Sequence, residues 1–195
     1  MGKFFENLNG VLGAGLALAI LIALLPDSGY ANSVGANDLW LGIFQWLHVF
    51  FGITWIGLLY YFNFVQIPSM PKIPDEHKPA IGKVIAPNAL FWFRWAAAAT
   101  VLFGLITAGA NDELDALYFA EGKRTIGIGM WLALIMAFNV WFVIWPNQKR
   151  ALGIVEADAD TKKRSARTAM LFSRTNTMLS IPMLYCMVAQ QNLGG

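Results

Sequence analysis

Charged side chains are scarce in this sequence of 195 residues. They make up 13% of the chain, whereas 57% of the residues are hydrophobic. A soluble domain carries about 25% charged residues, so the composition excludes an ordinary soluble protein and predicts an integral membrane protein. The formal net charge is only +2, and no basic stripe alternates with aromatic residues. A nucleic-acid partner is therefore excluded as well.

Cysteine and the common catalytic motifs are also scarce. The single cysteine, Cys186, excludes an internal disulfide and gives no zinc-type spacing. There is no CxxCH sequence, so the chain attaches no c-type haem of its own. GxGxxG is absent, and Gly127 and Gly129 open an apolar span instead of a phosphate loop. No motif of acyl or phosphoryl transfer is present, which leaves open whether the chain is an enzyme.

Five apolar segments dominate what the sequence does contain. Each approaches the roughly 20 residues that an α-helix needs to cross a bilayer. We predict an all-α integral membrane protein with a single membrane domain over 1–195 and five transmembrane helices in a bundle. The predicted helices are 8–26, 39–66, 87–108, 125–145 and 168–190. Pro68 and Pro71 are expected to end the second helix, Pro87 to open the third and Pro146 to follow the fourth. Residues 1–31 also resemble a secretory signal peptide, but we interpret them as a first, rather short transmembrane helix.

The distribution of Lys and Arg predicts the orientation of these helices. With a cytoplasmic N-terminus, Lys3 and the connections 67–86 and 146–167 place ten basic residues on the inner side. The outer connections carry only Lys123 and Arg124. By the positive-inside rule, the N-terminus is cytoplasmic and the C-terminus periplasmic.

His48 is the only histidine inside an apolar segment. It lies in the stretch 39–65, which has no charged residue, and an ionisable group at membrane depth is a candidate functional site. Gly52 and Trp55 share its helix face. A histidine with a glycine one turn later is typical of a b-type haem pocket, in which the imidazole binds the haem iron and the glycine leaves room for the ring. The alternative is a hydrogen bond across the bundle without a cofactor.

Three further polar residues interrupt the apolar segments. Arg94 and Arg174 are predicted at similar depth, about two turns from the cytoplasmic ends of their helices. There they are expected to bind carboxylates, such as haem propionates or a small anionic substrate. The alternative is that their long side chains extend to the headgroups. Asn139 lies near the centre of the fourth helix, where we expect an interhelical hydrogen bond.

Four stretches resemble one family. WLHVFFGITWIGLLYYFNFV (46–65) resembles the second-helix pattern of the membrane domain of the bacterial urate hydroxylase (urate oxidase N-terminal domain) family. NALFWFRWAAAATVLFG (88–104), VWFVIWPNQKR (140–150) and SRTNTMLSIPMLYCMV (173–188) are similar to its later helices. The residues that match are His48, Trp55, Gly57, Trp92, Arg94, Trp95, Asn176 and Pro182.

The resemblance implies a location in the bacterial inner membrane. Fuller members of the family join the membrane domain to a C-terminal cytochrome c domain, and they oxidise a purine while passing electrons onward. This sequence departs from the family twice. Thr175 stands where the family usually has a histidine, and the chain is shortened, without the cytochrome domain and several helices. Both departures argue against urate oxidation.

Three functions follow from these observations. The first is a small membrane subunit of a respiratory or other electron-transfer complex, with one b-type haem on His48. Its partners would be membrane lipid, other membrane subunits and a cytochrome c that exchanges electrons with it. The second is a non-catalytic accessory subunit without a cofactor. The third is a urate-hydroxylase-like purine oxidoreductase.

Overall fold

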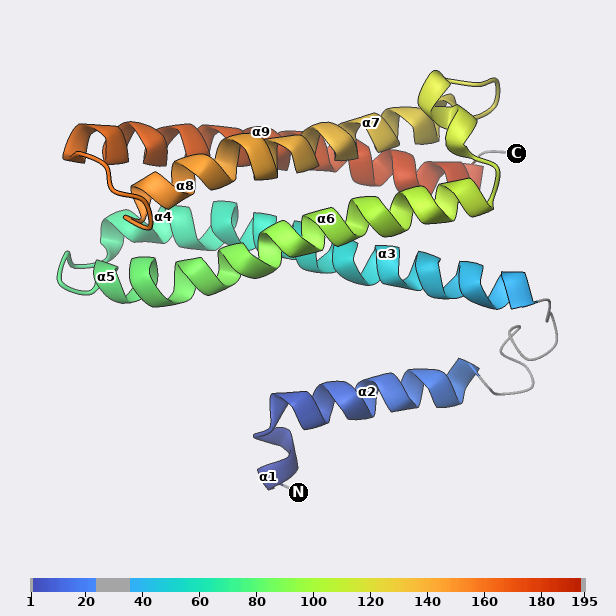
Figure 1. The fold of residues 1–195 in the computed structure, drawn as a ribbon, viewed down its shortest axis with the longest axis horizontal. Coiled ribbons are helices and arrows are strands. Elements are labelled where there is room, and N and C mark those ends of the chain that lie inside the picture. Colours follow the sequence, from blue (N-terminus) through green and yellow to red (C-terminus); the bar gives the residue numbers. More distant parts are fainter. Residues whose placement is uncertain (1, 24–35, 194–195) are drawn as a thin grey trace. The chain divides into compact units, whose positions relative to one another are not determined.

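The computed structural model describes residues 2–23 and 36–193, and every element in these ranges is a helix (Figure 1). The chain divides into two compact units, residues 1–43 and 44–195, with the division inside α3. The first unit contains α1 (Gly2–Phe5) and α2 (Leu8–Ala23). Residues 24–26 of the predicted first helix lie outside the described ranges. Helix α2 is apolar but short, and none of its described side chains is buried.

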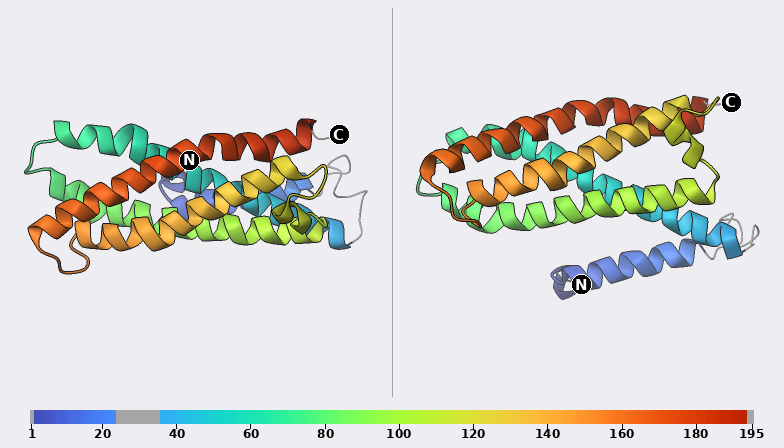
Figure 2. Two further views of the ribbon diagram at one scale, coloured as in Figure 1. Left: turned by 90° about the horizontal axis from the view of Figure 1, so that it is seen from above. Right: turned by 45° about the horizontal axis from the view of Figure 1, so that its top comes forward.

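Four long helical stretches form the second unit, and they lie side by side in a bundle (Figures 1 and 2). Three of them contain a π-helical segment, in which hydrogen bonds run from residue i to residue i+5. The first stretch is α3 (Ala36–Tyr60), π-helix η1 (Tyr61–Gln66), α4 (Ile67–Ser69) and 3₁₀-helix η2 (Met70–Lys72). The second is α5 (Lys78–Ala80), π-helix η3 (Ile81–Ile85) and α6 (Ala86–Ala110). The others are α7 (Arg124–Phe138), π-helix η5 (Asn139–Ile144) and α8 (Trp145–Ala151), and then α9 (Ala159–Leu193).

Three of these helical stretches are long and apolar enough to cross a membrane. They are Leu39–Lys72, Lys78–Ala110 and Arg124–Ala151. Helix α9 is long enough to cross a membrane, but it carries more polar side chains than these three stretches. Helix α2 is a shorter apolar helix of 16 residues. The all-helical fold is thus confirmed, whereas the crossing of a membrane by any of the five predicted helices stays a prediction.

Prolines do not end the helices where the sequence predicted. We expected Pro68 and Pro71 to end the second helix, which in fact continues to Lys72. Pro87 was expected to open the third helix and Pro146 to follow the fourth, yet both lie inside continuous helical stretches. Each π segment ends two residues before a proline. Proline lacks an N–H and its ring clashes with an earlier carbonyl, and the wider π turn accommodates both defects.

The core of the bundle lies where the four stretches meet. Trp55, Leu59 and Val140 are fully buried there. Phe62 of η1 packs edge-on against Phe93 of α6, with 5.8 Å between the ring centroids. Such pairs bury large apolar areas and prefer this geometry. Ala169 and Met183 of α9 belong to the same cluster, so the core unites residues from all four stretches.

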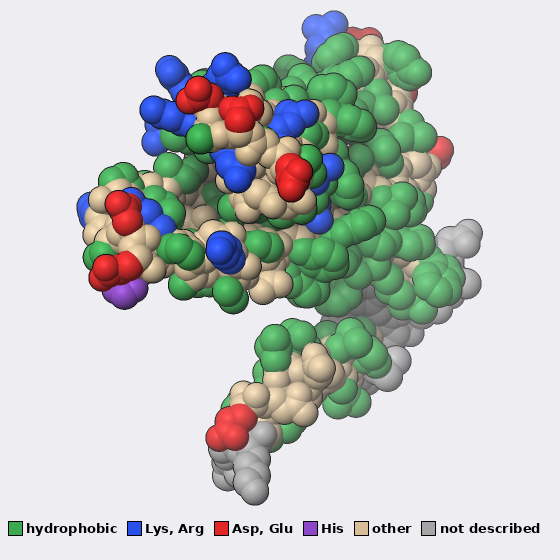
Figure 3. Space-filling view, turned by 60° about the vertical axis from the view of Figure 1, so that its left-hand side comes forward, with side chains coloured by type: hydrophobic (Ala, Val, Ile, Leu, Met, Phe, Trp, Pro, Cys, Tyr) green, Lys and Arg blue, Asp and Glu red, His purple; other side chains and the backbone are tan. Residues whose placement is uncertain are grey.

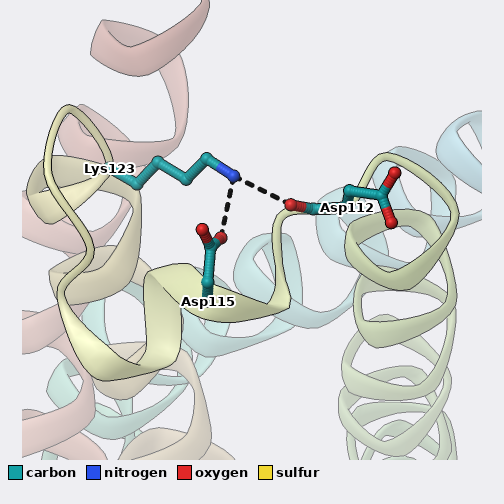
Figure 4. Close-up of polar contacts among 3 residues, drawn as sticks. All are labelled: Asp112, Asp115 and Lys123. Carbon is teal, nitrogen blue, oxygen red and sulfur yellow. Dashed lines mark hydrogen bonds and ion pairs between the residues drawn. The ribbon is translucent and has the colours of Figure 1, made fainter.

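The connection between α6 and α7 folds back on the helix ends. It contains 3₁₀-helix η4 (Leu114–Tyr118). Lys123 Nζ donates to Asp112 O and to Asp115 Oδ1, at 2.8 Å each (Figure 4). Gly127 in α7 packs against the backbone of Ala116, so closely that a Cβ there would collide with the Ala116 carbonyl oxygen. The connection thus closes tightly on the start of α7.

Asp158 caps the start of α9. Its carboxylate accepts from the Thr161 hydroxyl at 2.6 Å and from the Thr161 backbone N–H at 2.8 Å. These bonds, the hydroxyl first, lower the pKa of Asp158 below its ordinary 3.8. A capping carboxylate satisfies N–H groups that have no partner within the helix.

The lowered pKa fixes the pH dependence of this cap. The ionised form is stabilised in the folded state, so the cap contributes stability above pH 3.8 and loses it as the pH falls through the lowered value. We expect Asp158→Ala to speed hydrogen exchange in the first turn of α9 at neutral pH. Hydrogen-exchange mass spectrometry checks this, with Asp160→Ala as the control. Equal protection in wild type and Asp158→Ala would contradict it.

Candidate functional site

His48 is held by α6 through its backbone. Its Nδ1 lies 2.8 Å from the carbonyl oxygen of Thr100. Because a carbonyl oxygen only accepts, Nδ1 carries the proton and donates. Gly104, one turn further along α6, makes room for the ring, since a Cβ at residue 104 would lie 2.7 Å from Nδ1. In the neutral ring, Nε2 then carries the lone pair and is the atom that can bind a metal.

Aromatic rings also join α3 to α6 near His48 in the sequence. Phe103 of α6 stacks on Phe44 and on Phe51 of α3, with ring centroids 6.1 Å and 5.8 Å apart. His48 itself is half-buried. Phe44 and Phe51 share the helix face of His48, one turn before and one turn after it, so their contacts with Phe103 join α3 to α6 along the same face as the imidazole.

The space beside Gly52 is not open. A Cβ at Gly52 would meet the methyl group of Thr100 at 3.7 Å, which is ordinary contact between packed helices. Trp55 lies one turn further along α3, fully buried in the core, and its Nε1 has no hydrogen-bond partner. Nε2 of His48 is thus the one atom of this group that would hold a haem iron. The α3–α6 interface beside Gly52, however, is filled by Thr100.

The two arginines lie in different environments. Arg94 stacks on Trp145, with Cζ 3.4 Å from the ring centroid. It precedes Gly104 by ten positions on α6, about 15 Å along the helix axis. Arg174 lies on an exposed face of α9. The structure thus groups His48 and Gly52 against Thr100, but it does not bring either arginine to that group.

A buried polar network connects α9 to its neighbours. Asn139 Nδ2 donates to Asn176 Oδ1 at 2.8 Å, and Asn176 Nδ2 donates to the Met136 carbonyl at 2.9 Å. The interhelical hydrogen bond predicted for Asn139 is confirmed. Asn63 of η1 donates to the Ser173 hydroxyl at 2.8 Å. Buried amides of this kind fix the register between helices.

Sequence reasoning missed Thr100 and Gly104. Thr100 takes part through its backbone carbonyl, which every residue carries, and Gly104 through the absence of a side chain. The one available signal was that a buried histidine needs a hydrogen-bond partner. In the part of the chain that the structure describes, no group of three or more His, Cys, Asp or Glu could hold a metal ion. His48 therefore offers a single ligand.

Comparison with known proteins gives one match. The family described as urate oxidase N-terminal matches residues 112–192. This range covers η4, α7, η5, α8 and nearly all of α9, which is less than half of the chain. No curated protein and no solved structure matches the sequence. The chain thus resembles the urate oxidase N-terminal family over its last helices, and the match does not include His48 or Arg94.

Proposed function

We propose that this chain is a membrane subunit of an electron-transfer complex and binds one b-type haem through Nε2 of His48. All five apolar helices cross the bacterial inner membrane, with the N-terminus cytoplasmic and the C-terminus periplasmic. Three long apolar helices support membrane insertion, and the excess of basic residues in 146–167 supports the orientation. The hydrogen bond from His48 Nδ1 to Thr100 O carries the haem proposal.

Histidines that bind a metal commonly make a hydrogen bond of this kind. A ligating imidazole usually donates its other N–H to a carbonyl or carboxylate, which fixes the tautomer and raises the basicity of the ligating nitrogen. A bound haem supplies reversible one-electron transfer. His48 is the only histidine in the apolar segments of the sequence, so this chain would supply one protein ligand to the haem iron. The electron partner proposed for this complex is a cytochrome c.

One observation favours a second function, that of an accessory subunit without a cofactor. His48 fits against Gly104, and Gly52 against the Thr100 methyl group, so both small residues also serve close packing of α3 on α6. The same hydrogen bond then only holds two helices together. The structural observations give no comparable support to a urate-hydroxylase-like activity, because the family match does not include His48 and Thr175 occupies the histidine position of the family.

A reduced-minus-oxidised absorption spectrum tests the haem proposal. The purified native complex should show a b-type α band in wild type and in His77→Ala, which removes the exposed histidine. The band should disappear in His48→Ala, because the axial nitrogen is lost. Gly104→Ala keeps the imidazole but displaces it, and we expect a shifted or weakened band.

Folding and assembly are controlled separately. Circular dichroism of each variant, and recovery of the complex in equal yield, show that the bundle is intact. A band that persists unchanged in a folded His48→Ala complex would overturn His48 as the ligand. A wild-type complex without any haem band would leave the accessory subunit as the function.

A further inference from the structure

Arg94 has buried N–H donors without an acceptor. Its Nε and Nη1 are shielded from solvent and make no hydrogen bond. Nη2 is not buried in this way, so it is the nitrogen that a ligand reaches first. A desolvated N–H without an acceptor is unfavourable, and more so on a charged group. The stacking of the guanidinium on Trp145 does not satisfy these donors.

A second cation lies close to the same ring. Lys149 Nζ, from α8, is 5.6 Å from the centroid of Trp145. In the described ranges, neither Arg94 nor Lys149 pairs with a carboxylate. The ion pairs found there are Glu76–His77, Asp75–Lys78 and Asp115–Lys123. Two cations near one indole repel each other unless an anion lies near both.

The surroundings of this cation pair are apolar and exposed. Phe91 and Trp95 of α6 are exposed on either side of Arg94 in the sequence. Trp95 also packs edge-on against Trp141 of η5, with 5.3 Å between the centroids. Further basic side chains gather at the end of the second unit where α8 and the start of α9 lie (Figure 3). A ligand here meets positive charge beside a large apolar surface.

We propose that Arg94 and Lys149 bind the phosphate group of a phospholipid whose acyl chains lie along Phe91 and Trp95. The guanidinium presents paired N–H groups that match phosphate oxygens, and Lys149 adds a second charge. The first contact is at Nη2, and a small rotation of the side chain then exposes Nη1 to a second oxygen. Trp145 holds the guanidinium in place. The proposal rests on the membrane placement above but not on the haem.

Native mass spectrometry of the purified full-length chain in detergent micelles tests this site. The probe is dioleoylphosphatidylglycerol, titrated into delipidated protein. Wild type should bind one lipid tightly, and Arg94→Met should weaken this binding about tenfold or more, since a charge-assisted hydrogen bond is lost. Lys149→Met should weaken it less. Arg167→Met, which removes an exposed cation from α9, is the matched control and should bind as wild type does.

Inorganic phosphate is the second arm of the experiment. If it binds wild type and displaces the lipid, the site takes a soluble oxyanion and the phospholipid proposal is wrong. If Arg94→Met binds the lipid as tightly as wild type does, Arg94 is not the binding residue. The same conclusion follows if Arg167→Met loses as much lipid affinity as Arg94→Met. Arg94→Lys keeps the positive charge and therefore controls for misfolding of Arg94→Met. We expect its lipid affinity to lie between those of wild type and Arg94→Met. Alkaline extraction of membranes tests the membrane placement independently.

Discussion

Gly127→Ala is expected to destabilise the second unit by about 3 kcal/mol, at the upper end of the range for overpacking. The new Cβ would collide with the Ala116 carbonyl oxygen, which belongs to the backbone of η4 and cannot rotate away as a side chain would. Relief requires η4 to move away from α7, which also strains the contacts of Lys123 with the same connection. Thermal unfolding in detergent micelles, followed by circular dichroism, measures the effect.

Gly57→Ala is the matched control for this experiment. Gly57 is also a helical glycine, but a Cβ there would meet no atom within 4 Å. Alanine has the higher helix propensity by up to about 1 kcal/mol, so this variant should be neutral or slightly stabilised. A Gly127→Ala protein that unfolds at the same temperature as Gly57→Ala would show that η4 does not pack on α7 in this way.

Asn176→Leu is expected to destabilise the bundle by about 2–3 kcal/mol, as loss of a buried hydrogen-bond partner does. Asn176 is fully buried; its side-chain oxygen accepts from Asn139, and its amide N–H donates to the Met136 carbonyl. Leucine has the same number of side-chain heavy atoms, branched at the same carbon, but it leaves the Asn139 amide without its acceptor. Denaturant or thermal unfolding in micelles measures the change in the free energy of unfolding.

Thr175→Ala controls for the location on α9. Thr175 is exposed, and its hydroxyl bonds only to the Leu171 carbonyl of its own helix. Its replacement should change stability by less than about 0.5 kcal/mol. An Asn139→Ala/Asn176→Leu double variant should be less than additive, because the two residues share one hydrogen bond. Strict additivity would show that the two amides act independently.

The sequence was sufficient to predict the helices but not their ends. Long apolar runs predicted the four long helices of the second unit, because burial in a bundle or a bilayer selects for them, but not the helical turns within the predicted connections. Proline was the wrong signal for the ends. Its effect depends on whether the preceding turn can widen, and local sequence does not reveal this, since Pro68 and Pro146 have quite different residues before them.

The candidate site was predicted in part for similar reasons. His48 was identifiable because a lone ionisable residue in an apolar run stands out in any sequence. The Thr100 carbonyl that holds it has no side-chain signature. The two arginines looked equivalent from their depth, but depth does not determine which face of a helix a residue occupies. Arg94 faces Trp145. Arg174, in contrast, is exposed, although Ser173 and Asn176 beside it in the sequence are buried on another face of α9.

The π segments make the bundle sensitive to insertions and deletions. A π turn holds one more residue than an α turn, so η5 sets the angular phase of α8 relative to α7. Loss of a single residue between 139 and 144 would rotate everything that follows by about 100°. Trp145 would then turn away from Arg94. Substitutions within η5 affect only local packing, whereas insertions and deletions change which residues of two helices face each other.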